Sequence, residues 1–188
     1  MAVLTRYAFC FLVVFLPGCG GVSTYDQPWI STLRHELGYL GARNWVVVAE
    51  AAFPIHSRRG LRVVRINGSI PEVVDGVERV IEEKYHVKPR LYVTSEAHSV
   101  PYDYAPGIRN YHEQLGEALH GRETVQLEND MLMRMLNDTS KLYRVLVIKT
   151  NTALPYTSVF MELGSGYWDG ESESALREVI EKKKQSTD

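Results

Sequence analysis

Short runs of consecutive apolar residues recur along the chain and predict buried strands. The clearest run covers residues 45–49 and reads WVVVA, apolar at every position and rich in β-branched side chains. A strand buried on both faces of a sheet shows such a continuous run, whereas a half-exposed strand alternates. Further apolar segments at residues 61–66, 90–94, 124–127, 143–149 and 158–163 predict five more strands.

Helical periodicity separates these segments. The clearest helix begins after Ser69, because Ser69 and Glu72 have the spacing of a capping box and Pro71 fits the first turn. Its apolar stripe runs from Val73 to Tyr85, with charged side chains on the opposite face. Weaker periodicity predicts helices near residues 33–40, 108–119, 130–136 and 174–184.

The alternation of strands and helices predicts the fold class. It is typical of a mostly parallel sheet covered by helices, so we expect one layered α/β domain over residues 28–170. A charged helix and tail follow at residues 171–188. Ligands bind such sheets at the carboxyl ends of the strands. The candidate loops are therefore residues 50–57, 95–104 and 150–156.

The first residues have the pattern of a bacterial lipoprotein signal. Arg6 precedes a short apolar run at residues 7–16, and Leu16-Pro17-Gly18 precedes Cys19. The run is shorter than the roughly 20 apolar residues that span a bilayer, so we expect a cleaved signal at residues 1–18. Cys19 is then the lipidated residue and residues 19–27 are a tether. The alternative is an incidental cysteine in a secreted chain.

Composition narrows the compartment and the partners. Cleavage removes Cys10 and lipid blocks Cys19, so the exported chain has no disulfide and depends on its apolar core. With 21 basic and 23 acidic residues, nothing indicates nucleic acid as a partner. Acyl chains would hold the protein to a bacterial membrane outside the cytoplasm. Gly20 in place of aspartate after the lipidated cysteine predicts the outer membrane, facing the periplasm.

Three motifs together carry a family resemblance. Residues 40–57 read LGARNWVVVAEAAFPIHS, Arg134 lies 22 residues before Tyr156, and Tyr156-Thr157-Ser158 precedes an apolar strand. These features resemble the ribose pyranase and fucose mutarotase family. That family has a Leu-Gly-His turn, an apolar strand ending in Asp-Ala, Phe-Pro-Ala-His-Ser in its fucose branch, and Tyr-Gly-Asn or Tyr-Ala-Asn later. The resemblance covers about residues 31–164.

The resemblance implies both an assembly and a chemistry. It implies a small α/β protein that forms a ring-shaped homo-oligomer and binds a ribose- or fucose-like aldose in pockets shared between subunits. Family enzymes interconvert sugar anomers and ring forms without a metal or an organic cofactor. The matching positions imply that Glu50, Arg134, Tyr156 and Ser158 contact the sugar.

The departures from the family pattern leave catalysis open. Ala42 stands where the family has its catalytic histidine, Glu50 replaces an aspartate, and Ser158 replaces an asparagine. If these three positions share one pocket, the chemistry has been lost, moved to another residue or adapted to another ligand. His56 and His98 are the candidates for moving protons. The alternatives are a supporting polar role for His56 and a solvated loop position for His98.

Each remaining candidate has a structural alternative. Glu50 could form an ion pair, Tyr156 could be a buried tyrosine at a strand edge, and Arg134 lies in a Met-rich stretch typical of a core helix. The aromatic residues Tyr102, Tyr104, Tyr111 and Trp168 fit a sugar pocket and a subunit contact equally well. Metal is not expected, because the acidic and histidine side chains Glu96, His98, His112 and Glu113 lack the tight helical i, i+4 pairing of a ligand set.

Three functions are consistent with these observations. The protein could be a sugar isomerase with Glu50, Arg134 and Tyr156 holding hydroxyl groups. It could be a non-catalytic sugar-binding module in carbohydrate uptake that uses the same pocket. It could also be a structural envelope lipoprotein without a ligand.

Overall fold

The computed structural model describes residues 27–55 and 57–185. The predicted signal, Cys19, the tether up to residue 26 and His56 lie outside the described residues. The strands are β1 (Trp45–Ala49), β2 (Leu61–Arg65), β3 (Val87–Thr94), β4 (Thr124–Leu127), β5 (Val145–Lys149) and β6 (Val159–Ser165). The helices are α1 (Ile30–Leu37), α2 (Ile70–Glu82), α3 (Ile108–Ala118), α4 (Asn129–Leu142) and α5 (Gly170–Gln185), with a short 3-10 helix, η2 (Ser95–Ser99).

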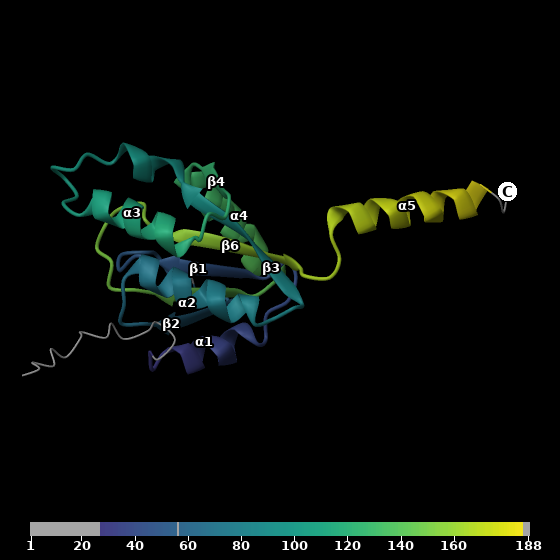
Figure 1. Cartoon of the computed structure of the whole chain (residues 1–188), viewed down its shortest axis with the longest axis horizontal. Coiled ribbons are helices and arrows are strands. Elements are labelled where there is room, and N and C mark those ends of the chain that lie inside the picture. The colour runs from purple at the N-terminus through teal and green to yellow at the C-terminus, as the bar shows by residue number, and fades with distance from the viewer. Residues whose placement is uncertain (1–26, 56, 186–188) are drawn as a thin grey trace, which may run out of the picture.

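The six strands form one sheet in the order β2-β5-β1-β6-β3-β4 (Figure 1). Pairings β2/β5, β5/β1 and β3/β4 are parallel, whereas β6 runs antiparallel to both β1 and β3. The α/β fold class is confirmed, and so is a mostly parallel sheet, since β6 alone runs against the other five strands and makes the sheet mixed. The chain leaves β5, passes over the carboxyl end of β1 and returns at once as β6. No helix lies in that connection, so β6 comes back in the opposite direction.

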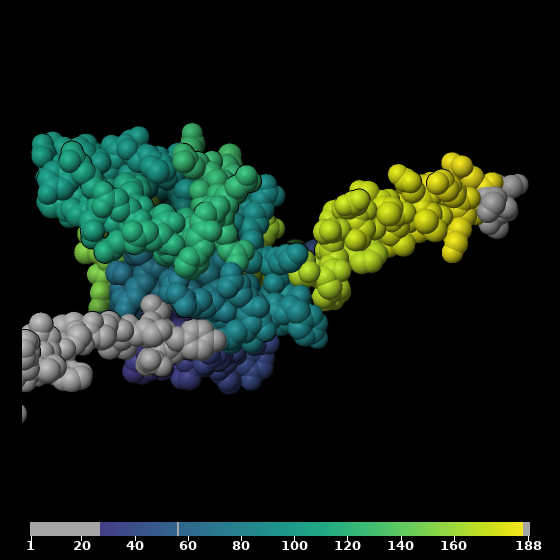
Figure 2. All heavy atoms as spheres, viewed as in Figure 1, coloured from purple at the N-terminus to yellow at the C-terminus, as the bar shows by residue number. Residues whose placement is uncertain are grey.

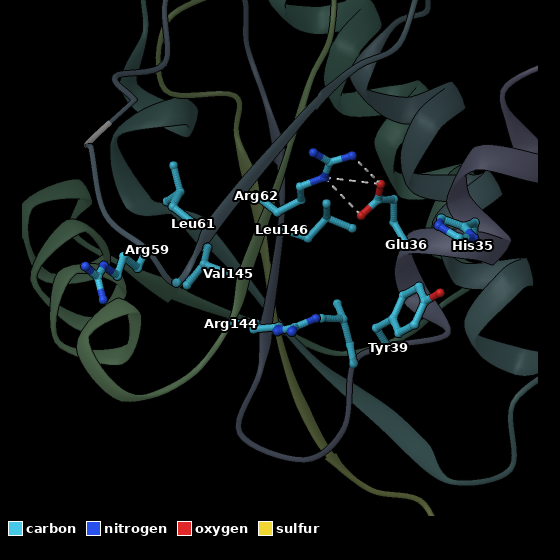
Figure 3. Close-up of a pocket in the computed structure, with 11 residues that line it drawn as sticks. His35, Glu36, Tyr39, Arg59, Leu61, Arg62, Arg144, Val145 and Leu146 are labelled. Carbon is cyan, nitrogen blue, oxygen red and sulfur yellow. Dashed lines mark hydrogen bonds and ion pairs between the residues drawn. The ribbon is translucent and has the colours of Figure 1, made fainter.

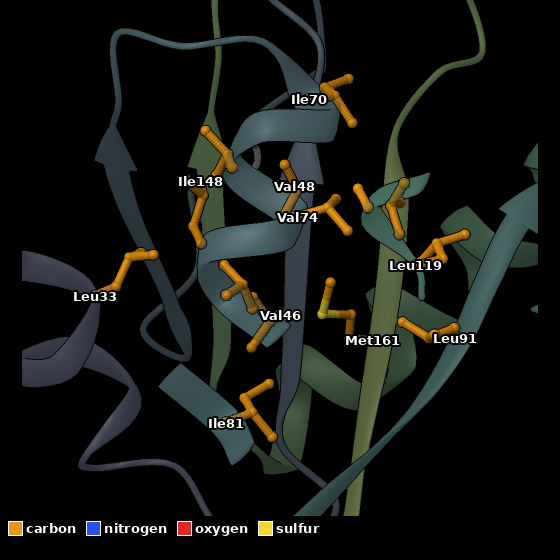
Figure 4. Packing of buried hydrophobic residues seen from close by; sticks show 14 of the residues in the cluster. Leu33, Val46, Val48, Ile70, Val74, Ile81, Leu91, Leu119, Ile148 and Met161 are labelled. Atoms are coloured by element: carbon orange, nitrogen blue, oxygen red, sulfur yellow. The ribbon is translucent and has the colours of Figure 1, made fainter. Parts of the chain in front are cut away.

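Helices cover both faces of the sheet and bury two apolar clusters. Val46 and Val48 of β1 face α1, α2 and α3, whereas Trp45 and Val47 face α4. Figure 4 shows Val74 of α2 packed over this central part of the sheet. Because β1 is buried on both faces, every one of its five residues is apolar.

The capping box predicted for α2 is confirmed. The Glu72 backbone N–H donates to Ser69 Oγ at 3.4 Å, and the Ser69 N–H donates back to the Glu72 carboxylate at 3.3 Å. These bonds satisfy donors that a helix start otherwise leaves unpaired. The cap fixes where α2 leaves the carboxyl end of β2.

Two helices are longer than predicted. Helix α4 is predicted at residues 130–136 but extends from Asn129 to Leu142. Its last turns are polar and show no apolar stripe, so the sequence pattern does not reveal them. Helix α5 was expected at residues 174–184 but begins at Gly170, where the Asp169 carboxylate accepts the Ser172 N–H at 2.9 Å. No residue of α5 is buried, and the helix stands clear of the domain (Figure 2). No helix within the described ranges is long and apolar enough to cross a membrane.

Gly166 allows β6 to leave the sheet close to the start of β3. Its N–H donates to the His86 carbonyl at 3.0 Å. A Cβ there would meet the Tyr85 carbonyl and lie 2.9 Å from the Val87 nitrogen, and both are backbone atoms that cannot rotate away.

Gly166→Ala is therefore expected to lower the free energy of unfolding by about 1–3 kcal/mol, the usual cost of overpacking. Urea denaturation measures the effect. Gly170→Ala is the matched control, because a Cβ at Gly170 meets nothing within 4 Å. Equal urea midpoints for the two variants would show that the strand ends are not in close contact.

Candidate functional site

A cavity of about 500 Å³ lies at the carboxyl ends of β1 and β5. The loop after β1 forms one wall, the connection between β5 and β6 forms another, and the start of α4 closes the side. The residues that line it are Glu50, Ala51, Ala52, Phe53, Pro54, Asn129, Met133, Ala153, Leu154, Pro155 and Tyr156. The predicted loops at residues 50–57 and 150–156 therefore meet in one cavity.

Among the described residues that line this cavity, Glu50 is the only one with an acidic or basic side chain that is charged near neutral pH. Its backbone N–H donates to Ser158 Oγ at 3.2 Å, and the Ser158 hydroxyl donates to the Glu50 carboxylate. Glu50 makes no ion pair with any described residue, so the ion-pair alternative is wrong for the described part of the chain. The neighbouring Lys149 ammonium instead donates to the Phe53 carbonyl at 2.9 Å. Two predicted site residues, Glu50 and Ser158, are thus in direct contact.

Burial raises the pKa of Glu50. Removal of the carboxylate from water is the largest cause, and a backbone hydrogen bond and the nearby charge of Lys149 lower the pKa by smaller amounts. A carboxyl group with a raised pKa is protonated more often near neutral pH than an exposed one. Such a group can donate as well as accept a proton, as acid–base catalysis requires.

The raised pKa of Glu50 makes stability depend on pH. The folded chain holds the Glu50 proton more tightly than the unfolded chain, so stability falls as pH rises from the unfolded pKa through the folded one. Glu50→Gln should therefore raise the melting temperature at pH 8 and leave it nearly unchanged at pH 4. Thermal denaturation at both pH values checks this, with the exposed Glu113→Gln as control. A stabilisation that is equal at both pH values would contradict the account.

Tyr156 lies in a loop that the protein holds in an unusual backbone conformation. Its φ is 59°, in the left-handed region that non-glycine residues rarely adopt. Thr94 Oγ1 donates to the Tyr156 carbonyl at 2.5 Å, and the Tyr111 hydroxyl donates to the Thr157 carbonyl at 2.6 Å. The Tyr156 side chain is 43% exposed, so the alternative of a buried tyrosine is wrong. The constrained backbone holds Tyr156 at the wall of the Glu50 cavity.

Tyr111 holds this loop through its hydroxyl group, and the sequence does not predict that role. It lies in α3 and is 5% exposed, and burial raises the pKa of its hydroxyl. Nothing in the sequence near Tyr111 indicates that its hydroxyl reaches a carbonyl 46 residues further along the chain. The other predicted aromatic residues, Tyr102, Tyr104 and Trp168, are 49%, 87% and 44% exposed and do not line the cavity.

Arg134 is not brought into the cavity. It is exposed on α4, one residue after Met133, which does line the cavity. Arg134 makes no hydrogen bond or ion pair with the described residues. The Met-rich stretch is partly core, because Leu132 and Leu136 are buried while Met131 is 42% exposed. Arg134 therefore lies beside the cavity rather than within its walls.

Ala42 and Glu50 lie at opposite ends of β1. Ala42 is exposed in the turn before the strand, where the Arg43 N–H donates to the Leu163 carbonyl. The five residues of β1 alone separate the two positions by about 16 Å at roughly 3.3 Å per residue. One subunit therefore does not bring positions 42, 50 and 158 into a single pocket. These positions can meet only across two subunits.

His98 belongs to a neighbouring cavity. It lies in η2 and is exposed, and its ring stacks on His112 with centroids 4.8 Å apart. Both histidines and Tyr156 line a smaller cavity of about 160 Å³. Tyr156 thus separates His98 from Glu50 while contributing to both cavities. His56, the other histidine candidate, lies outside the described residues.

Glu96, His98 and His112 make other contacts with the described residues. Within residues 27–55 and 57–185, no group of three or more histidine, cysteine, aspartate or glutamate residues could hold a metal ion. Glu96 accepts the Asn129 N–H at the start of α4, with N–O distances of 2.9 and 3.1 Å. Glu96 therefore links the third predicted loop, residues 95–104, to the side of the Glu50 cavity.

Several solved structures resemble this chain. RbsD of Bacillus subtilis complexed with D-ribose matches with a TM-score of 0.47 and 19% identity, over 71% of this chain and 92% of that chain. The fucose mutarotase of Streptococcus pneumoniae in complex with L-fucose has a TM-score of 0.46 and 18% identity, over 76% and 94% of the two chains. A protein proposed to bind sugar has a TM-score of 0.51 and 16% identity, over 78% and 97%. No protein-family model and no curated protein sequence matches the chain.

These findings define a class by its fold. The chain is a single-domain α/β protein with a mixed six-stranded sheet, the architecture of the protein matched at a TM-score of 0.51. The fold that the sequence resemblance implied is therefore confirmed.

Proposed function

We propose that the protein binds a monosaccharide in the Glu50 cavity and interconverts its anomers or ring forms. The observation that carries this proposal is the Glu50 carboxyl group, partly buried at the cavity wall, held by Ser158 and without an ion-pair partner among the described residues. Around it the cavity is mostly apolar, with Tyr156 and Phe53 among the lining residues. Sugar sites combine a few fixed polar groups with aromatic and apolar walls.

The chemistry that this proposal requires is proton transfer. Ring opening of a cyclic sugar delivers a proton to the ring oxygen while a proton leaves the anomeric hydroxyl. A carboxyl group with a raised pKa can perform either transfer, and one positioned acid or base contributes about 10² to 10⁴ in rate. His98 beyond Tyr156 and His56 in the loop after Glu50 are the candidates for the second proton-transfer group.

Magnetisation-transfer NMR tests this function directly. Ribose, fucose, galactose and glucose are each measured with and without protein, and faster exchange between anomers of one sugar supports catalysis. Line broadening without faster exchange indicates binding alone. Sugar signals unchanged for all four would contradict both.

A non-catalytic sugar-binding module is the second candidate. The observation that favours it is the absence of any histidine among the described residues that line the Glu50 cavity. Ala42 at the other end of β1 also leaves a single subunit without the family's histidine near Glu50. The variant Ala42→His separates the two candidates if the protein forms a ring-shaped homo-oligomer, because position 42 of one subunit can then face Glu50 of the next. In such a ring the added histidine should raise the rate of anomer exchange. In a monomer the same variant should leave the exchange rate unchanged.

We also propose that Cys19 carries lipid and anchors the protein to the periplasmic face of the outer membrane. The signal-like residues 1–18 and the position of Cys19 support this proposal. Labelling of cells with radioactive palmitate should mark the native chain and not Cys19→Ser. Label retained by Cys19→Ser would contradict the anchor.

A further inference from the structure

The edge of the sheet opposite the Glu50 cavity carries two adjoining hollows. One of about 460 Å³ lies beside α1 and the starts of β2 and β5, and another of about 690 Å³ lies beside the end of α4. They share Tyr39, Arg59, Gly60 and Arg144, so they form one continuous groove. We call the arginine and lysine residues that line this groove the basic edge: Arg58, Arg59, Arg62, Lys141 and Arg144.

The basic edge concentrates positive charge on a chain whose formal net charge is −2. Among the described residues that line the groove, Glu36 is the one acidic residue, and Arg62 binds it at 2.9 Å. Lys141 pairs with Asp138 at 2.6 Å. Arg59 and Arg144 make no ion pair or side-chain hydrogen bond with a described residue. The basic edge therefore presents uncompensated positive charge to solvent.

The basic side chains do not converge on a single anion. Figure 3 shows Arg59 and Arg62 on different sides of the hollow, with Arg62 directed towards Glu36 and Arg59 directed away from it. Two apolar side chains among them, Leu142 and Tyr39, are 81% and 63% exposed. Spread positive charge interleaved with exposed apolar side chains fits a field of phosphate groups above hydrocarbon better than one small ligand.

Helix α5 leaves the domain on the same side as the basic edge. Strand β6 ends where β3 begins, since Ser165 pairs with Val87, so α5 leaves from the edge at which β1, β2 and β5 start. The last turn of α5 carries three basic residues, Lys182, Lys183 and Lys184. Four acidic residues and Arg177 precede these lysines, so α5 as a whole has no net charge, and Lys184 pairs with Glu181 at 3.2 Å. The positive surface therefore lies in the basic edge, and α5 extends away from the domain (Figure 1).

We infer that the basic edge binds the surface of a membrane rich in anionic phospholipid. Arginine and lysine near such a surface each contribute about 1 kcal/mol, and Leu142 and Tyr39 can enter the headgroup layer. The Glu50 cavity lies at the other end of β1, so a domain bound through the basic edge keeps that cavity open to solvent. The inference depends on neither the lipid at Cys19 nor sugar binding.

Vesicle co-sedimentation tests this inference on the chain from Gly20 onward. Both apolar clusters and the side chains packed against them lie between Trp29 and Leu163, so this chain keeps the whole described core and lacks the anchor. It should bind vesicles of equal parts phosphatidylglycerol and phosphatidylcholine, bind phosphatidylcholine alone far more weakly, and detach as salt is raised. Arg59→Gln with Arg144→Gln should weaken binding about 30-fold, from about 1 kcal/mol per residue.

The matched control carries Arg65→Gln and Arg109→Gln, which remove the same charge away from the basic edge. It should bind as the unchanged protein does. Equal binding to neutral and anionic vesicles would overturn the inference, as would equal weakening by both pairs of substitutions. Saturable binding of free glycerol phosphate would assign the groove to a small phosphate compound instead. Equally tight binding of a single-stranded oligonucleotide would show a general preference for polyanions, and either result overturns the membrane assignment.

Discussion

Arg122→Ala should lower the free energy of unfolding by about 3–5 kcal/mol, the usual cost of leaving a buried charge unpaired. Glu78 of α2 is 1% exposed, and Arg122 Nε lies 2.6 Å from its carboxylate. Burial raises the pKa of Glu78, and the charge of Arg122 is the largest opposing cause. Because single domains are stable by about 5–15 kcal/mol, this one substitution removes a large share of the total. Urea denaturation at pH 7 measures it.

Two further variants identify Glu78 as the cause. Glu78→Gln in the Arg122→Ala background removes the unpaired charge and should recover part of the loss. Lower pH should also recover it, since the loss arises only while Glu78 is ionised. Arg177→Ala is the matched control, because it breaks an exposed pair with Glu173 and should cost less than about 1 kcal/mol. Similar losses for Arg122→Ala and Arg177→Ala would contradict this account.

Glu50→Gln should abolish most of the anomer exchange, with a fall of about 10² to 10⁴ in the rate that the protein adds. Glutamine keeps the size of the side chain and can still accept a hydrogen bond from Ser158, but it cannot exchange a proton. Sugar binding should weaken less than exchange does, because the apolar walls and Tyr156 are unchanged. Magnetisation-transfer NMR gives the exchange rate, and a titration of the same samples gives the affinity.

The exposed Glu113→Gln is the control and should leave both quantities unchanged. Ser158→Ala distinguishes positioning from proton transfer, because it frees the Glu50 carboxylate and shifts the pH at which exchange is fastest. Full exchange activity in Glu50→Gln would assign the proton transfer to another residue. The cavity would then be a binding site in which Glu50 has no chemical role.

Local sequence signals predicted the elements of this fold well. The five apolar residues of β1 reflect burial on both faces, and the Ser69–Glu72 cap fixes the start of α2. The carboxyl ends of β1 and β5 were expected to bring their loops together, and Glu50 and Tyr156 do line one cavity. These predictions hold because each depends on residues close in sequence or on a general property of α/β sheets.

Features that depend on distant residues were not predicted. The reversal of β6 follows from the path of the chain over β1, and a strand looks alike in sequence whichever way it runs. Ala42 and Glu50 are eight positions apart, yet β1 separates them by its full length. Arg134 is a site candidate only through its spacing to Tyr156, and spacing does not indicate which side of α4 faces the cavity. The hydrogen bond from the buried Tyr111 to the Tyr156 loop also depends on the tertiary fold, so the local sequence does not predict it.

The most direct test of the sugar-binding proposal is an amide NMR titration with ribose or fucose. If a sugar occupies the cavity beside Glu50, the amide signals of Ala51, Ala153 and Tyr156 should shift together and saturate with one dissociation constant. Amides along the basic edge, such as those of Arg59 and Arg144, should stay in place. Saturable shifts confined to the basic edge, or no shifts at all, would contradict the proposal.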